Sequence, residues 1–277
     1  MKIYADSGST KTEWILLINN EIAYRFETIG MNPFFVKEKE IIFEIEKHLK
    51  KYNFEKIKEL NFYGAGCSTF EKIEWLKRIF STLFVNATIN IKTDIEGAVL
   101  ATSKKGEKSI TSILGTGSAF RIFDGKNIIK KYSSLGYIIG DEGSGTHISK
   151  ALLRRIMYKQ LDYKLEKAFF EYFNTTREEI IENIYSKPFP NRYLAKFTKF
   201  CNKNIENEII EKIVLDSFYS FFKNHISNIE NYKNYKLHFI GSIAYYFQDQ
   251  LKNVANEYDC DFGIVLQKPL QSLILKS

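Results

Sequence analysis

The sequence has few of the residues that hold metals or crosslinks. Its 277 residues include three cysteines and four histidines. Cys67, Cys201 and Cys260 lie far apart without a CxxC spacing, which argues against a zinc or iron–sulfur site within the chain and favours reduced, buried thiols. The histidines form no HExxH pair, so a histidine-ligated metal is not expected either.

Long apolar runs are also missing, since no run approaches the ~20 residues that a membrane-spanning helix needs. The first residues enter a strand without an apolar signal core, which predicts a cytoplasmic protein. The net charge of +7 would suit a nucleic-acid binder, but lysines alternate with glutamates along residues 38–51, as on a solvated helix face. We therefore expect no membrane and no nucleic-acid partner.

The pattern that organises the chain spans residues 2–18, where an apolar strand runs into Asp6 and a turn of small and hydroxyl residues precedes Lys11. Glycine lets the backbone approach an anion, hydroxyl and N–H groups donate to it, and lysine adds charge. Asp6, at the strand end, is placed to hold a hydrated metal ion. Taken alone, the same residues also suit an ordinary β-hairpin with a polar turn.

The same pattern recurs in residues 109–123, with a turn at 115–118. Each copy is followed by a polar turn and a third strand, and the Asn-Asn and Asp-Gly pairs suit tight hairpins. This duplication predicts two similar lobes, each offering one loop to a shared cleft that clamps a polyphosphate. The boundary between the lobes is predicted at about 105–108.

Further candidate residues lie at the predicted ends of strands. Asn32 either presents its amide to a ligand or forms a turn before Pro33. Asp94 ends a strand and opens a helix, at the edge where α/β sheets bind ligands, although Asp also serves as a helix N-cap. Gly241 and Ser242 join a strand to a helix predicted over 243–258, as a nucleotide site or a short turn.

The glycine-rich run 133–145 carries two adjacent carboxylates, Asp141 and Glu142, and leads into a helix. Backbone N–H groups at a helix start can face an anion, and the combination of glycines and acids favours a binding site over a linker. Residues 160–232 are predicted to be helical.

Taken in order, these segments resemble the acetate kinase–hexokinase–Hsp70–actin superfamily, and most closely the N-acetylglucosamine kinase-like branch of the BadF/BadG/BcrA/BcrD ATPase family. The combination is far more specific than any single motif and spans essentially the whole chain. The segments that carry the resemblance are DSGSTKTEW (6–14), Asn32-Pro33, Asp94, LGTGS (114–118), LGYIIGDEGSG (135–145), KPFPNR (187–192) and FIGS (239–242).

The resemblance implies an α/β fold of two ribonuclease H-like, actin-like ATPase domains, with a nucleotide and sugar cleft between them. The domains would be 1–108 and 109–277, with a helical insertion at about 146–232 and a segment 267–277 able to pack back on the first domain. It implies an ATP- and Mg²⁺-dependent kinase that converts an amino sugar, first of all N-acetylglucosamine, to its 6-phosphate, as a homodimer. N-acetylmuramic acid or glucosamine as substrate, a BadF-type ATPase that drives a partner protein, and a nucleotide sensor without turnover remain alternatives.

The resemblance also implies a role for each matching residue. Asp6 would hold Mg²⁺ through water, and Asp94 would be the general base. The phosphates would meet Gly8, Ser9, Thr10, Lys11, Thr116 and Gly117; Gly241 and Ser242 would border the adenosine; and the sugar would bind Asn32, Ser118, Gly136 and Asp141.

Two departures from the pattern touch the predicted sugar pocket. Mammalian-type N-acetylglucosamine kinases carry Gly-Trp-Gly where this chain has Ser134-Leu135-Gly136, and Asn where it has Ala119. Both leave the predicted ATP contacts in place and leave the identity of the sugar open.

Overall fold

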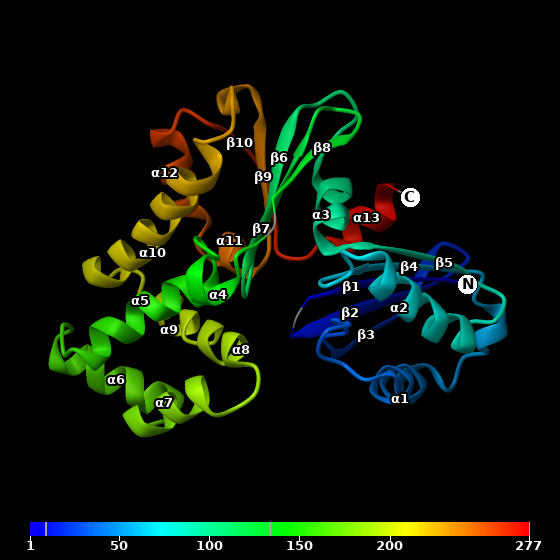
Figure 1. The fold of residues 1–277 in the computed structure, drawn as a ribbon, viewed down its shortest axis with the longest axis horizontal. Coiled ribbons are helices and arrows are strands. Elements are labelled where there is room, and N and C mark those ends of the chain that lie inside the picture. Colours follow the sequence, from blue (N-terminus) through cyan, green and yellow to red (C-terminus); the bar gives the residue numbers. More distant parts are fainter. Residues whose placement is uncertain (9, 133, 277) are drawn as a thin grey trace. The chain divides into compact units, whose positions relative to one another are not determined.

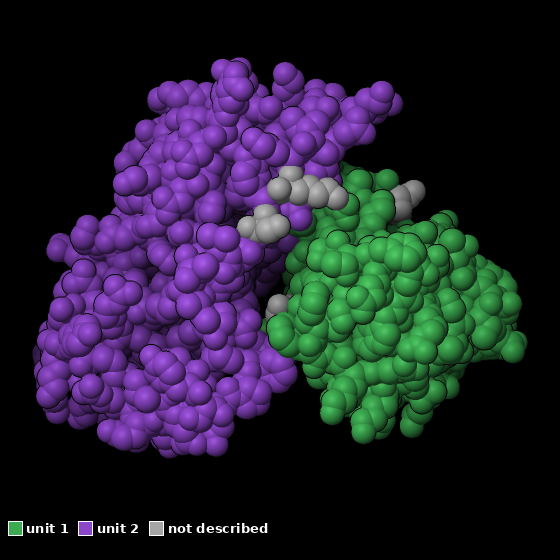
Figure 2. All heavy atoms as spheres, viewed as in Figure 1, with its two compact units in different colours: residues 1–102, 268–277 green, residues 103–267 purple. Residues whose placement is uncertain are grey.

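The computed structural model describes residues 1–8, 10–132 and 134–276. The chain divides into two compact units, which we call unit 1 (residues 1–102 and 268–277) and unit 2 (residues 103–267), coloured separately in Figure 2. The first boundary therefore falls before the predicted 105–108. Residues 103–108 pack with unit 2 because the Gly106 N–H donates to the Gly125 carbonyl (2.8 Å) and Glu107 pairs with His238 (3.0 Å).

Unit 1 is built on a five-stranded sheet with the order β3-β2-β1-β4-β5 (Figure 1). Its first three strands form antiparallel pairs, whereas β4 and β5 join β1 in parallel. The strands are β1 (Lys2–Ser7), β2 (Lys11–Ile18), β3 (Glu21–Ile29), β4 (Glu59–Gly64) and β5 (Thr88–Thr93).

The sheet of unit 2 repeats this plan with the order β10-β9-β6-β7-β8. Its first three strands are again antiparallel neighbours, and β9 and β10 again join in parallel. The strands are β6 (Ser109–Leu114), β7 (Ser118–Phe123), β8 (Ile128–Tyr132), β9 (Lys236–Ile240) and β10 (Asp261–Leu266). The predicted duplication of a three-stranded unit and the predicted fold class are thus confirmed.

In unit 1, helices α1 (Glu38–Leu49) and α2 (Phe70–Leu83) bury their apolar residues in one core with Trp14 and Phe62 of the sheet. Helix α3 (Asp94–Thr102) covers the other face, where Gly97 lies on the ring of Tyr63 so closely that a Cβ would be 2.8 Å from it. Helix α13 (Leu270–Lys276), from the end of the chain, contacts α3 and β1. A short 3-10 turn spans Phe54–Lys56.

Unit 2 carries the helical segment between β8 and β9, with a core rich in phenylalanine around Phe169, Phe197 and Phe200. The predicted helix 243–258 is broken at the buried Phe247, whose backbone (φ −117°, ψ 34°) is not helical. The helices are α4 (Gly136–Ile139), α5 (Gly145–Met157), α6 (Tyr163–Phe173), α7 (Arg177–Tyr185), α8 (Pro190–Ala195), α9 (Thr198–Lys203), α10 (Glu208–Phe221), α11 (Ser242–Tyr246) and α12 (Gln248–Glu257), with a π turn at Phe222–Ile226 and a 3-10 turn at Tyr232–Asn234.

All three cysteines are free and buried, as predicted. Burial raises the pKa of Cys67 and of Cys201 to about 12, so both thiols stay protonated near neutral pH. Within the described residues, no helix combines the length and the apolar character needed to cross a bilayer.

Candidate functional site

In unit 1, the candidate residues lie at one edge of the sheet. Strands β1, β4 and β5 are parallel neighbours whose last residues, Ser7, Gly64 and Thr93, are in register. Their carboxyl ends therefore meet at the edge where open α/β sheets bind ligands. Asp6 is the second-last residue of β1, next to this edge, and Asp94 follows β5 directly.

The sequence left open whether Asp94 is the N-cap of helix α3. The hydrogen bonds of Thr93 and Glu96 show which residue caps the helix. The Thr93 hydroxyl accepts a hydrogen bond from the Glu96 N–H (3.2 Å), and the Glu96 carboxylate accepts from the Thr93 N–H (2.9 Å). This reciprocal pair is a capping box, so Thr93 caps α3. Asp94 lies one residue further, partly exposed, with Oδ1 accepting from the Ile95 N–H (2.8 Å). The helix therefore does not need this carboxylate as its cap.

The carboxylate of Asp6 is in an acidic environment, because Glu13 is its register partner on β2. Burial, and then the negative charges of Asp94 and Glu13, raise the pKa of Asp6 to about 7, against the opposing charge of Lys268. A cation beside Asp6 would favour its ionised form. No three His, Cys, Asp or Glu side chains of the described residues are grouped to hold a metal. An ion at Asp6 would therefore keep water ligands, as Mg²⁺ commonly does.

Asn32 is buried beside the loop that follows β4. Its Oδ1 accepts from the Phe34 N–H (3.0 Å), so it does form a turn. The same atom would lie 2.3 Å from a Cβ at position 66, where Gly66 has a φ of +82°. Only glycine fits this close approach, which joins the Asn32 loop to the edge that carries Asp6 and Asp94.

The turn between β1 and β2 is closed by a hydrogen bond from the Gly8 N–H to the Lys11 carbonyl (3.0 Å). Gly8 and Thr10 are exposed, whereas Ser9 lies outside the described residues. The Lys11 ammonium donates to Glu27 (2.8 Å), and Lys268 bridges Glu27 (3.0 Å) to Glu13 (3.2 Å). Lys11, the predicted phosphate ligand, therefore has a carboxylate partner in this structure.

Sequence reasoning missed this ion network. The period-2 alternation of the strands places Lys11, Glu13 and Glu27 on one face of the sheet and could have revealed that part. Lys268 follows the crossing from unit 2, and no local pattern connects it to Glu13.

In unit 2, the turn 115–118 is fastened to the start of α5. The Gly145 N–H donates to the Gly115 carbonyl (2.8 Å), and the Thr146 N–H donates to the Thr116 carbonyl (3.2 Å). The Gly115 N–H closes the turn on the Gly117 carbonyl (3.0 Å). The glycine-rich run and the second predicted phosphate turn thus form one structural group.

Asp141 connects the residues of unit 2 that were predicted for the sugar, Ser118 and Gly136. Its buried carboxylate Oδ1 accepts from the Ser118 N–H (3.3 Å) and from the Ser134 hydroxyl (2.5 Å), which in turn accepts from the Gly136 N–H (2.9 Å). A Cβ at Gly117 would lie 2.7 Å from Oδ2. Among the described residues, the hydrogen bonds to this carboxylate go to Oδ1 and none goes to Oδ2. Ser134 was noted in the sequence only as a departure from a family pattern.

Gly241 lies against the same edge of the unit 2 sheet. Its φ is +114°, and a Cβ would lie 2.4 Å from the Leu114 carbonyl oxygen, directly before the 115–118 turn. Ser242 is exposed and begins α11. By contrast, Glu142 pairs with His225 (3.0 Å) and Asn224 (3.2 Å), so its neighbours already hold it.

Comparisons with known proteins show the family to which the chain belongs. No family model matches it, and no curated protein matches it. Among solved structures, a putative N-acetylglucosamine kinase from Porphyromonas gingivalis is 34% identical, with a TM-score of 0.93 over 100% of this chain and 98% of that chain. The chain belongs to this N-acetylglucosamine kinase-like family. The predicted resemblance to such kinases is therefore confirmed, while the narrower BadF assignment stays a prediction.

More distant structures share the fold of this N-acetylglucosamine kinase-like chain. A putative N-acetylglucosamine kinase from Chromobacterium violaceum is 13% identical, with a TM-score of 0.74 over 99% of this chain and 98% of that chain. A ROK family glucokinase from Streptomyces griseus, in complex with glucose and AMPPNP, is 11% identical, with a TM-score of 0.63 over 99% and 97%. At these identities the likeness shows the fold alone.

Proposed function

We propose that the chain is an ATP-dependent sugar kinase whose acceptor is the 6-hydroxyl of N-acetylglucosamine. The observation that carries the proposal is the 34% identity to the Porphyromonas gingivalis protein along nearly the full length of both chains. Support comes from the residues of each unit: the motif-matched positions gather at one sheet edge in unit 1 and at one sheet edge in unit 2.

Phosphoryl transfer requires positioning of the reactants and neutralisation of charge more than covalent chemistry. We assign Asp94 as the base that accepts the proton of the sugar hydroxyl, since one carboxylate suffices for that task. Asp6 would hold a hydrated Mg²⁺, which supplies positive charge to the phosphates. The phosphate ligands in this proposal are Gly8, Thr10, Lys11, Thr116 and Gly117, with Ser9 outside the described residues.

For the sugar, we assign Asn32, Ser118, Gly136 and Asp141, with the Asp141 Oδ2 as the acceptor for a hydroxyl. Gly241 would let the nucleotide approach the backbone, because it has no Cβ, and Ser242 would border the adenosine. A homodimer is the proposed assembly.

The test is a coupled ATP-consumption assay over hexoses, hexosamines and their N-acetyl derivatives, with N-acetylmuramic acid included. We expect ATP consumption that depends on an amino sugar and is fastest with N-acetylglucosamine. Hydrolysis at the same rate without any sugar would contradict the kinase and favour a BadF-type ATPase.

The matched variant is Asp94→Asn, which keeps the shape of the side chain and removes the base. We expect kcat to fall by roughly 10²–10⁴-fold, the usual contribution of a general base. ATP binding, measured by calorimetry, should persist. Wild-type turnover in this variant would remove Asp94 from the mechanism.

A further inference from the structure

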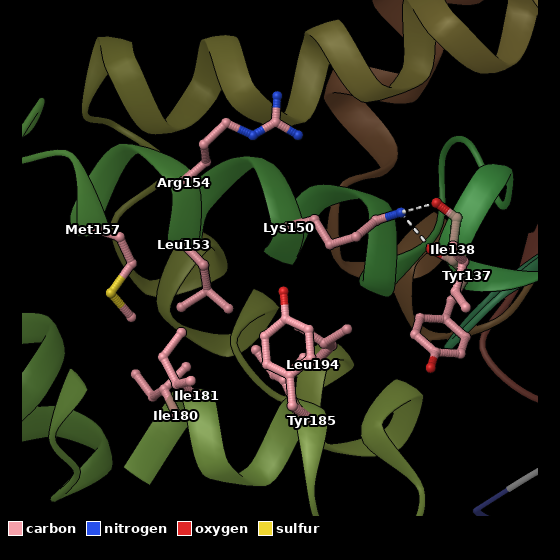
Figure 3. Close-up of a pocket in the computed structure, with 11 residues that line it drawn as sticks. Tyr137, Ile138, Lys150, Leu153, Arg154, Met157, Ile180, Ile181, Tyr185 and Leu194 are labelled. Atoms are coloured by element: carbon pink, nitrogen blue, oxygen red, sulfur yellow. Dashed lines mark hydrogen bonds between the residues drawn. The ribbon is translucent and has the colours of Figure 1, made fainter. Parts of the chain in front are cut away.

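A cavity lies in unit 2, and its lining does not include the candidate residues described above. It has a volume of about 480 Å³ and lies between α5 and α7, with α4 at one end (Figure 3). Small-molecule sites commonly have roughly 300–1,000 Å³ and an apolar lining with a few polar groups. Leu153 and Met157 point into it from α5, and Ile180 and Ile181 point into it from α7 (Figure 3).

The charged side chains that line this cavity have one sign. Lys150 and Arg154, one turn apart on α5, line it, and no carboxylate of the described residues does. The guanidinium of Arg154 points away from the apolar side chains, whereas the ammonium of Lys150 lies at the α4 end (Figure 3). That ammonium donates to the main-chain carbonyls of Tyr137 and Ile138. Carbonyl dipoles compensate a charge only in part, so Lys150 can still accept an anion.

We propose that this cavity binds an amphiphilic monoanion, with its apolar body between α5 and α7 and its acid group on Lys150. Both parts of the ligand follow from the lining, since an apolar molecule without charge would leave the ammonium with its two carbonyl partners alone. A small polar anion would leave the leucine, methionine and isoleucine side chains in contact with water.

Through Lys150, a ligand in the cavity would act on the residues assigned to the sugar. This step rests on the proposed function. Lys150 holds α4, a helix of four residues that begins at Gly136 and is followed by Gly140 and Asp141. An acid group that draws the ammonium away would free the α4 carbonyls, and the glycines at both ends let the segment turn. The ligand would thereby change the affinity for the sugar.

The experiment uses anilinonaphthalene sulfonate as the probe and its uncharged analogue N-phenylnaphthylamine as the matched control. Each is titrated into the chain of 277 residues and followed by fluorescence, with the stoichiometry measured by calorimetry. We expect one sulfonate per chain. Lys150→Met should weaken the sulfonate about tenfold or more, the worth of one charge-assisted hydrogen bond, and leave the neutral analogue unchanged.

Ile181→Glu places a carboxylate at the half-exposed mouth of the cavity, where folding tolerates it, and should weaken both probes. Val85→Glu is the control at an exposed apolar residue of unit 1. Equal binding in the wild type and Ile181→Glu, or an equal loss in Val85→Glu, would overturn the proposed site. Equal sulfonate binding in Lys150→Met would overturn the anion specificity.

Binding needs no turnover, so these outcomes stand whether or not the chain phosphorylates a sugar. In the kinase assay, saturating probe should change the sugar KM of the wild type and leave that of Ile181→Glu unchanged. An unchanged sugar KM in the wild type would refute the coupling between the cavity and the sugar residues.

Discussion

The raised pKa of Asp6 predicts that this carboxylate destabilises the folded chain above neutral pH. Its pKa rises from an ordinary value of 3.8 to about 7, through burial and the charges of Asp94 and Glu13. Between these two values the unfolded chain has released the proton while the folded chain retains it. The free energy of unfolding therefore falls as the pH rises from about 4 to about 7, and the loss persists above that range.

The size of the effect follows from the difference of about three in pKa, which corresponds to about 4 kcal/mol. Asp6→Asn keeps the shape of the side chain and removes the titration. We expect the variant to gain up to about 4 kcal/mol over the wild type above pH 7 and to match it near pH 4. The same substitution should abolish kinase activity, because the proposed magnesium site loses its anion.

The measurement is urea denaturation of both proteins from pH 4 to pH 9 without divalent cations, then at pH 8 with millimolar Mg²⁺. Magnesium should stabilise the wild type and leave Asp6→Asn unchanged, because the ion offsets the ionised carboxylate. Glu21→Gln, at an exposed residue of the same sheet, is the control. A stability difference between wild type and Asp6→Asn that stays constant over the pH range would refute the reasoning.

Two further predictions concern unit 2. Gly241→Ala should lower the free energy of unfolding, measured by urea denaturation, by about 3 kcal/mol, because its Cβ would lie 2.4 Å from the Leu114 carbonyl oxygen. Gly106→Ala is the control: its φ is +84°, but a Cβ there would have no atom within 4 Å, so the loss should be smaller. An equal loss in both variants would exclude the clash as the cause. Ser134→Ala should raise the sugar KM about tenfold with the ATP KM unchanged, since Asp141 loses a hydroxyl donor, and Ser134→Thr should restore it. Equal changes in both KM values would instead indicate a general loss of structure.

Local rules were enough to predict both strand–turn–strand copies. The turns at 7–10 and 115–118 and the polar pairs that follow them specify hairpins within a few residues. The break at Phe247 was missed because the apolar periodicity continues across it, and its buried ring belongs to the core of unit 2. Unit 1 ends at residue 102, before the predicted 105–108, because residues 106 and 107 bond to Gly125 and His238, which are distant in the sequence.

In the candidate site, too, some features could be predicted from the sequence and others depend on the tertiary structure. Residue type and place in the motif were enough to select Asp6, Asp94 and Asp141, because strand ends, glycines and acids are local features. The contacts around two of them involve residues outside the motif that selected them: Lys268 pairs with Glu13 beside Asp6, and Ser134 donates to Asp141. The capping box of Thr93 and Glu96 beside Asp94 is, by contrast, a local feature. A pKa, a free carboxylate oxygen or a cavity exists only after such side chains meet, since charge and burial depend on distance in space. The sequence therefore determined the duplicated scaffold and the residues with suitable chemistry, and the tertiary structure decided their electrostatic state.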